Sequence, residues 1–312
     1  MEGNFFKIKP YDESLGLSII VDFYNQMAKY LNPETTLQIN EELARVILGK
    51  ETVLSRDYLI FENKQGEIIA FAGISNVPVY KDTWLCIYGV LPEYIGSELP
   101  GELIDAILNL GKELNAPEVL FQTFGELSAP FEKKLESIGF SPVNYTWSMC
   151  LDDFDLFSHP GIPQDIAIRN LNEIDDYANF VTVINEAFAG SFKFKPVKKM
   201  KWKKVQEALK KNHIVEYCVA YEKDKIVGLC DIYLNPKQDQ IGLIGDLSVL
   251  PRNQHRKIGS ALLASGIELL RKKGCKTIKL SVDTENEKAL GLYKKFGFYV
   301  QNNLTQKTYQ II

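Results

Sequence analysis

The residues best suited to chemistry lie in a loop near the carboxy terminus, Val249-Leu-Pro-Arg-Asn-Gln-His-Arg-Lys-Ile-Gly-Ser260. Pro251 ends the preceding strand, because proline cannot donate to the hydrogen-bond ladder of a sheet. From Gln254 onward the chain turns into a helix, whose first amides have no partner within the helix and carry the positive end of its dipole. Such a turn is a candidate binding site for an anion.

The side chains of this loop favour the same prediction. Four basic residues add full charges to the partial charge of the helix terminus: Arg252, His255, Arg256 and Lys257. Gly259 lacks a side chain, so a ligand can approach the backbone closely there. A basic loop that only caps an ordinary helix would have the same composition, and the loop alone does not separate the two interpretations.

A second motif is Asn286-Glu-Lys-Ala-Leu-Gly-Leu-Tyr-Lys-Lys-Phe-Gly-Phe298. Helical spacing places four of its residues on one face: Ala289, Leu292, Tyr293 and Phe296. Asn286 can cap this helix, and Gly297 ends it before the chain enters another strand. Tyr293 carries a hydroxyl that could donate a proton, although a core aromatic residue with a satisfied hydroxyl would give the same pattern.

The elements that must position these motifs follow one order in the carboxy-terminal half. Strands are expected at Ile166–Leu171, Val215–Tyr221, Lys225–Tyr233, Ile241–Val249, Thr277–Val282, Phe298–Gln301 and Lys307–Ile311. Helices are expected at Glu173–Phe188, Val197–Lys211, Lys257–Lys272 and Asn286–Lys295. This order predicts an antiparallel meander followed by one right-handed β-α-β crossover.

The 312 residues suggest two domains of about 150 residues each, and the sequence repeats itself. Three pairs of segments match, at offsets of 159, 158 and 158 residues: Gly89–Tyr94 with Ser248–Asn253, Ser137–Phe140 with Lys295–Phe298, and Glu67–Ile74 with Lys225–Ile232. Collinear matches favour a duplication over two unrelated α/β domains. We expect domains at residues 1–154 and 165–312, joined by a linker at 155–164 that contains two prolines and a glycine.

The composition argues against several classes of protein. Lys and Arg number 36 and Asp and Glu 40, a net charge of −4, so we expect no broad nucleic-acid-binding surface. The five cysteines and three histidines lack metal-binding spacings and are too sparse for a disulfide scaffold, so we expect no metal. No apolar run approaches a membrane-spanning length, and the amino terminus lacks the apolar core of a signal peptide. We therefore expect a cytoplasmic protein without a membrane partner.

Together, the two motifs resemble those of the GNAT superfamily of acyl-CoA-dependent N-acyltransferases. The strand ending Val-x-Pro is present at Val249, and the later motif Asn-x-x-Ala-x-x-x-Tyr-x-x-x-Gly-Phe is complete. In the loop motif Gln/Arg-x-x-Gly-x-Gly/Ala, Gln254 and Gly259 match, whereas Lys257 replaces the first glycine. The resemblance covers residues 165–312. It implies an α/β (α+β) fold with two tandem GNAT-like domains, each a mixed, mostly antiparallel sheet flanked by helices.

The resemblance also implies a site for acetyl-CoA. Pantetheine would lie along the strand that ends at Val249, against the backbone of Leu247 and Val249. The pyrophosphate would be held by the loop amides: Gln254, His255, Arg256, Lys257, Ile258, Gly259 and Ser260. Asn286 would contact the cofactor, and Tyr293 would be the general acid that protonates the departing thiolate, a contribution of about 10²–10⁴-fold.

An amine that attacks the thioester must be neutral, yet a free alkyl ammonium has a pKa near ~10, so a base or a desolvating pocket is needed. Asp246 and Asp231 are the candidate bases, although a strand carboxylate is as often a structural hydrogen-bond acceptor. The acceptor region is expected at residues 188–196. The nine lysines from Lys193 to Lys211 could attract an acidic acceptor or phosphates, or form the solvated face of a helix.

The first half lacks these chemical features. Its equivalent loop, Glu93–Gly101, contains two acidic residues and no basic one. Leu135 stands where Tyr293 does, and Ser128 where Asn286 does. We predict a degenerate GNAT-like domain that contributes structure or part of the acceptor site. Tandem GNAT proteins of the mycothiol synthase type are similar in plan.

Three functions remain open on this basis. The leading hypothesis is an N-acetyltransferase, monomeric or homodimeric, that moves an acetyl group from acetyl-CoA to a primary amine of a small molecule, peptide or protein. The second is a non-catalytic acyl-CoA-binding or interaction protein. The third is an aminoacyl transferase, a class that generally lacks the pyrophosphate loop and carries a long helical arm, neither of which fits this chain.

Overall fold

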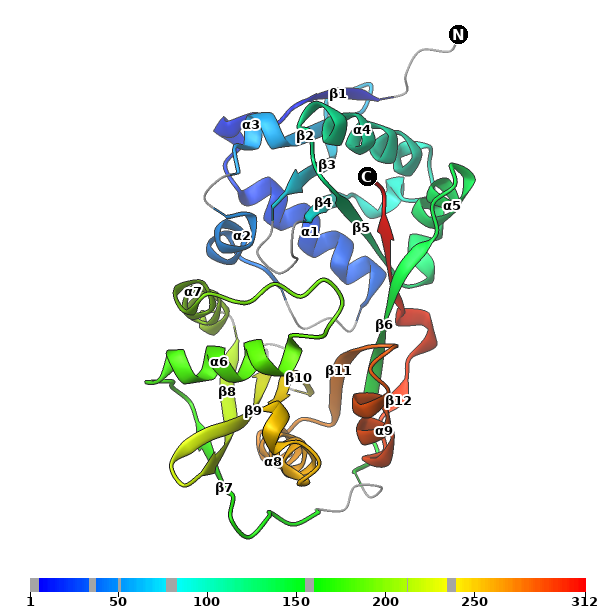
Figure 1. Cartoon of the computed structure of the whole chain (residues 1–312). Coiled ribbons are helices and arrows are strands. Elements are labelled where there is room, and N and C mark those ends of the chain that lie inside the picture. The colour runs from blue at the N-terminus through cyan, green and yellow to red at the C-terminus, as the bar shows by residue number, and fades with distance from the viewer. Residues whose placement is uncertain are drawn as a thin grey trace. The chain divides into compact units, whose positions relative to one another are not determined.

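The computed structural model describes residues 6–33, 38–49, 52–76, 83–154, 160–211, 213–234 and 240–312 (Figure 1). The chain divides into two compact units, which we call unit 1 (residues 1–145 and 302–312) and unit 2 (residues 146–301). Each unit contains a mostly antiparallel sheet with helices, which confirms the predicted fold class. The first half of the predicted linker, residues 155–159, lies outside the described residues.

The sheet of unit 1 contains strands from both ends of the chain. In spatial order the strands are β1 (Lys7–Pro10), β2 (Tyr58–Glu62), β3 (Ile68–Ser75), β4 (Trp84–Val90), β5 (Val119–Phe124) and β13 (Gln306–Gln310). All neighbouring strands are antiparallel except β4 and β5, which are parallel. A parallel pair needs a crossover connection, and here a helix provides it.

Five α-helices accompany this sheet: α1 (Ser18–Leu31), α2 (Glu41–Leu48), α3 (Leu54–Asp57), α4 (Leu99–Glu113) and α5 (Ala129–Ser137). Helix α1 is amphipathic, because its buried residues recur at intervals of three or four: Ile20, Phe23, Met27 and Leu31. Helix α2 begins where the side chain of Asn40 accepts a hydrogen bond from the amide of Leu43 at 2.8 Å. Helix α4 connects β4 to β5.

From β7 to β12, the elements of unit 2 follow the predicted order. Its strands, in spatial order, are β7 (Ala167–Leu171), β8 (Ile214–Glu222), β9 (Lys225–Leu234), β10 (Ile241–Val249), β11 (Thr277–Asp283) and the end of β6 (Pro142–Leu151), which also pairs with the short β12 (Tyr299–Val300). Its helices are α6 (Tyr177–Phe188), α7 (Lys199–Lys210), α8 (Ile258–Lys272) and α9 (Glu287–Lys295). Helix α6 begins four residues later than predicted, because Asp176 caps it by accepting from the amide of Asn179 at 3.1 Å.

Helix α8 packs closely on the sheet of unit 2. Its buried face is formed by eight residues: Ile258, Ala261, Leu262, Leu263, Ala264, Gly266, Ile267 and Leu270. A Cβ atom at Gly266 would lie 3.1 Å from the sulfur of Cys230 on β9, so a small residue permits this approach. This contact fixes the helix against the strands that carry the site.

The two units repeat the same series of elements. Helices α1 and α6 begin at Ser18 and Tyr177, and α4 and α8 begin at Leu99 and Ile258, an offset of 159 residues in both cases. Helices α5 and α9 begin at Ala129 and Glu287, an offset of 158 residues. These offsets equal those of the matching sequence segments, which favours an internal duplication.

The units differ from the expected domains at two segments. Strand β13 was expected to complete the carboxy-terminal domain, but it pairs with β5 in unit 1, from Gln306 opposite Phe124 to Gln310 opposite Leu120 (Figure 1). Residues 146–151 were assigned to the first domain, but they pair with β11 in unit 2. Each unit therefore takes a strand from the sequence of the other half. Buried Tyr309 and Ile311 explain the first change, because they belong to the hydrophobic core of unit 1.

Candidate acetyl-transfer site

The site begins where strands β10 and β11 separate. Their parallel pairing covers only Ile241 to Leu243, opposite Thr277 to Lys279. Beyond Leu243, no described strand pairs with this edge of β10, which continues to Val249. An unpaired strand edge presents amide and carbonyl groups that can bind an extended ligand. Leu247 and Val249, the predicted pantetheine contacts, both lie in this segment.

A β-bulge interrupts β10 in the same segment. Ile244 pairs with Ile232 of β9 and Leu247 with Cys230, so Gly245 and Asp246 together lie opposite Asp231. A Cβ atom at Gly245 would lie 2.4 Å from the ring of Tyr233 and 2.6 Å from the carboxyl oxygen of Asp231, so only glycine fits. A bulge can re-aim a side chain, and this one brings Asp246 near Asp231. Glycine within a strand, the signal for the bulge, was not used in the sequence analysis.

Asp231 and Asp246 form a carboxyl pair. Asp231 is fully buried, and its Oδ2 accepts a hydrogen bond from the hydroxyl of Tyr233 at 2.6 Å. Burial, followed by the charge of Asp246, raises the pKa of Asp231 well above its ordinary value. Burial also raises the pKa of Asp246, to about 6. A carboxyl group with this pKa can accept a proton near neutral pH.

The predicted anion-binding loop has a row of unpaired amides. The amides of residues 255–260 donate to no described residue, and the first bond of α8 is from Ala261 to the carbonyl of Lys257 at 3.0 Å. His255 and Lys257 have positive φ angles of 63° and 62°. Lys257 therefore has the left-handed conformation that favours the glycine found at this position in the GNAT motif. The lysine keeps the turn and places a charge at the start of the helix.

Two features of this loop differ from the prediction. The amide of Gln254 is not available to an anion, because it donates to the carbonyl of Pro251 at 3.3 Å. The side chain of Gln254 instead donates to the carbonyl of Val249 at 3.2 Å and so holds the end of β10. This interaction joins the loop to the unpaired strand edge.

The basic side chains of the loop are partly neutralised. Arg252 forms an ion pair with Glu186 at 3.3 Å. Arg256 forms ion pairs with Asp165 and, at 2.7 Å, with Glu222. The hydrogen bond to Glu222, together with the charges of both carboxylates, raises the pKa of Arg256. These three carboxylates are distant in sequence, so the loop composition alone could not reveal them. Exposed His255 and Lys257 are the basic side chains that remain for a ligand.

Tyr293 and Asn286 occupy the positions predicted from the second motif. The side chain of Asn286 accepts from the amide of Ala289 at 3.1 Å and caps α9. Tyr293 is only 7% exposed, and its ring lies 5.9 Å from that of Phe298. Its hydroxyl bonds to no described residue. Burial, with smaller effects of Cys230 and Asp246, raises the pKa of Tyr293, so the phenol keeps its proton.

The predicted acceptor region precedes α7. The rings of Phe188 and Phe194 lie 6.1 Å apart. Burial, followed by the charge of Lys195, lowers the pKa of half-buried Lys201 to about 8.

In the equivalent loop of unit 1, four of the six corresponding amides are not available to a ligand. The amides of Ser97 and Gly101 donate to backbone carbonyls at 3.1 Å, and that of Leu99 donates to the hydroxyl of Ser97 at 3.1 Å. Pro100, which corresponds to Gly259, has no amide hydrogen. Leu135, which corresponds to Tyr293, is fully buried. Unit 1 therefore lacks a row of amides for a pyrophosphate.

Two further properties of the described residues concern metal-binding clusters and membrane-spanning helices. In the parts of the chain that the structure describes, no three His, Cys, Asp or Glu side chains gather in a group that could hold a metal ion. The described helices include none with the length and apolar character that crossing a membrane requires.

Comparisons with known proteins identify a family for the part of the chain that contains this candidate site. The pattern of the acetyltransferase (GNAT) family matches residues 177–298, which include the β10 bulge, the amide loop and Tyr293. A mycothiol acetyltransferase of Paenarthrobacter aurescens is 26% identical over 220 residues, covering 67% of this chain and 65% of that protein. An uncharacterized N-acetyltransferase of Methanocaldococcus jannaschii is 31% identical over 136 residues, covering 42% of this chain and 59% of that protein. The chain thus spans less than two thirds of either curated relative.

Solved structures match almost the whole chain. A tandem GNAT protein from the clavulanic acid biosynthesis pathway has a TM-score of 0.72 at 12% identity, covering 98% of this chain and 99% of that one. A GCN5-related N-acetyltransferase from Sphaerobacter thermophilus has a TM-score of 0.68 at 20% identity, covering 98% and 95%. The chain therefore has the fold of a tandem GNAT protein. Residues 177–298 are a domain of the GNAT acetyltransferase family, an acyl-CoA-dependent class.

Proposed function

We propose that the protein transfers an acetyl group from acetyl-CoA to a primary amine, and that unit 2 carries out the reaction. The observation that supports this proposal most strongly is the row of unpaired amides at residues 255–260, next to the unpaired edge of β10. Six amides at a helix N-terminus suit a pyrophosphate. The strand edge suits the amides of pantetheine, which would pair with the backbone of Leu247 and Val249.

The thioester supplies the activated acyl group, and the residues of this chain move the protons. Asp246 accepts a proton from the ammonium form of the acceptor, directly or through water. Its raised pKa of about 6 leaves it mostly ionised at neutral pH while keeping it basic enough for this role. The hydroxyl of Tyr293, protonated and without a described partner, donates a proton to the leaving thiolate.

The acceptor class is a primary amine on a small molecule or a protein. The relative from Paenarthrobacter aurescens is named for mycothiol, which makes small-molecule amines the first group to screen. The carboxyl pair of buried Asp231 and half-buried Asp246 would attract an ammonium group before it loses its proton. The co-substrate would be acetyl-CoA, and the reaction would need no metal.

The first test measures binding and turnover together. Acetyl-CoA should bind one site per chain by calorimetry, whereas acetyl-pantetheine, which lacks the pyrophosphate, should bind at least tenfold more weakly. A panel of primary amines is then screened by release of the free thiol of CoA. Acetyl-CoA that binds no better than acetyl-pantetheine would contradict the assignment of the amide loop.

Tyr293→Phe tests the proposed acid. The variant keeps the aromatic packing on Phe298 but lacks the hydroxyl, so kcat should fall by about 10²–10⁴-fold while the Kd of acetyl-CoA stays within twofold. Tyr299→Phe is the matched control, since exposed Tyr299 bonds to Asp152 on the surface and should retain full turnover. Equal kcat values for the two variants would exclude Tyr293 as the acid.

A further inference from the structure

Unit 1 contains a cavity at the place that corresponds to the proposed active site of unit 2. Strands β4 and β5 pair only at Trp84 and Leu85, opposite Val119 and Leu120. Beyond these residues the two strands separate, and a cavity of about 340 Å³ lies between them, closed by residues of α1 and α2. Every described residue that lines it belongs to unit 1. The degenerate unit has therefore kept the opening between its parallel strands.

The size of the cavity is that of a ligand site. Pockets for small molecules typically measure about 300–1,000 Å³, whereas the voids left by protein packing are much smaller. A cavity of this size that is partly open to solvent leaves apolar side chains in contact with water, which is unfavourable. A bound molecule would replace that water.

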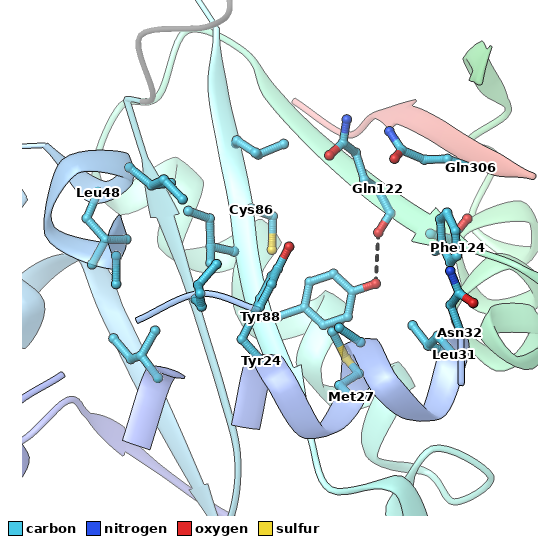
Figure 2. A pocket seen from close by; sticks show the side chains of 18 residues that line it. Tyr24, Met27, Leu31, Asn32, Leu48, Cys86, Tyr88, Gln122, Phe124 and Gln306 are labelled. Carbon is cyan, nitrogen blue, oxygen red and sulfur yellow. Dashed lines mark hydrogen bonds between the residues drawn. The ribbon is translucent and has the colours of Figure 1, made fainter. Parts of the chain in front are cut away.

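The lining determines the chemistry of such a molecule. None of the described residues that line the cavity is charged. Apolar side chains form most of the wall, and those from α1 and α2 include Met27, Ile47 and Leu48. Figure 2 shows the side-chain amides of Asn32, Gln122 and Gln306 together on one side, with Leu48 on the opposite side. The cavity thus has an apolar body and one end that carries amide groups.

Tyr24 and Tyr88 add hydroxyl groups to the wall. The hydroxyl of Tyr88 donates to the carbonyl of Gln122 at 2.8 Å, the bond drawn in Figure 2. The hydroxyl of Tyr24 bonds to no described residue, and burial raises its pKa. Tyr24 is half-buried, so its hydroxyl can form a hydrogen bond with a molecule in the cavity.

The loop of unit 1 disfavours coenzyme A as this ligand. Three of the amides that correspond to the free row of unit 2 already donate within the loop, and Pro100 removes a fourth. Glu93 and Glu98 place negative charge where a pyrophosphate would lie. An uncharged lining also disfavours a carboxylate, because burying an unpaired charge is costly.

From this cavity we propose that unit 1 binds a small, neutral molecule with an apolar body and an amide or hydroxyl head group. The head group lies at the end formed by Asn32, Gln122 and Gln306, and the apolar body lies against α1 and α2. The cavity thus lies at the ligand-binding position of the fold, but it would bind an uncharged ligand in place of a phosphate-bearing one.

Calorimetry on the full chain with octanamide, octanoate and coenzyme A tests this proposal. Octanamide should bind once per chain, at least tenfold more tightly than octanoate, and saturating coenzyme A should not displace it. No binding of octanamide up to its solubility limit, equal binding of octanoate, or displacement by coenzyme A would overturn the proposal. These outcomes are independent of turnover in unit 2, because they concern a different ligand.

Cavity-filling variants locate the site. Ala28→Leu on α1 should lower the affinity for octanamide at least tenfold, since the added atoms occupy the cavity. Ala106→Leu on α4 is the matched control, because Ala106 is also half-buried but lies outside this lining, and it should leave the affinity unchanged. Ile47→Phe on α2 fills the opposite wall and replaces Ala28→Leu if that chain does not fold. Unchanged octanamide binding in a folded cavity-filling variant would show that the molecule binds elsewhere.

Discussion

Asp246 titrates unusually because of where the bulge places it. Its pKa of about 6 lies above the ordinary 3.8 since burial penalises its charged form. The folded chain therefore holds this proton more tightly than the unfolded chain does. Stability accordingly falls as the pH rises from 3.8 to about 6, while the same rise in pH creates the base that catalysis needs. The same carboxyl group thus lowers the stability of the fold at the pH values at which it can act as a base.

Asp246→Asn separates the two effects. The wild-type kcat/KM should rise with pH to a plateau, with its midpoint near 6, and the variant should lose both this limb and about 10²–10⁴-fold of the rate. At pH 7 the variant should be more stable, by on the order of 1–3 kcal/mol, because it buries no charge. Thermal unfolding measures the change in stability, and pH–rate profiles measure the change in kcat/KM. A hairpin control, Asp224→Asn, alters an exposed carboxylate and should change neither quantity.

Individual residues also show how far sequence reasoning extends. Local spacing predicted the helices that carry Tyr293 and follow the 255–260 amides, and the structure contains both helices. The roles of these groups come from the resemblance to the GNAT motifs and stay predictions. The bulge at Gly245 depends on its register with β9, and the neutralisation of Arg252 and Arg256 depends on Glu186, Asp165 and Glu222. Contacts between distant segments cannot be obtained from a motif, so these features required the structure.

Helices α4 and α8 have the same length and follow similar turns, but their first amides differ. Both are 15 residues long, and both follow a short 3-10 turn that begins at a proline. Helix α8 starts with unpaired amides, while the start of α4 contains Pro100 and amides that are internally bonded. The order and lengths of such elements were predictable from periodicity, whereas the state of their terminal amides was not.

A pair of substitutions at Gly259 tests this contrast. Gly259→Pro copies the residue that unit 1 has at this position and removes one amide, and proline is tolerated in the first turn of a helix. Gly259→Ala adds only a Cβ atom, which would meet Val249 and Leu292 at ordinary distances of 3.8 and 3.9 Å, and keeps the amide. Calorimetry should show acetyl-CoA affinity reduced at least tenfold by proline and changed less than threefold by alanine. Equal losses of acetyl-CoA affinity in the two variants would indicate that the shape of residue 259, rather than its amide, determines binding.

At the scale of the whole molecule, the exchange of strands joins the two sequence halves. Strand β13 contributes buried Tyr309 and Ile311 to unit 1, and Lys307 forms an ion pair with Glu132 at 2.6 Å. Sequence analysis predicted this strand at nearly the correct residues but in the wrong sheet. Periodicity identifies a strand, but its partner is decided by packing with segments far away in the sequence.

A chain that ends at Gln301 tests the exchange. Loss of β13 should destabilise unit 1 by at least about 3–6 kcal/mol, since two large side chains lose their burial. Hydrogen exchange should therefore accelerate in β5, while unit 2 still binds acetyl-CoA. The control Lys307→Ala removes only a partly exposed ion pair and should cost less than about 1 kcal/mol. Full protection of β5 in the shortened chain would contradict the role assigned to β13.

The pairing of β5 with β13 also has a consequence for synthesis. Leu120 lies opposite Gln310, 190 residues further along the chain. Contacts so distant in sequence slow folding, because a long loop must close before they form. On the ribosome, most of unit 1 emerges first, yet its sheet stays incomplete until all of unit 2 has been translated. The half that is made first is thus the last to finish folding.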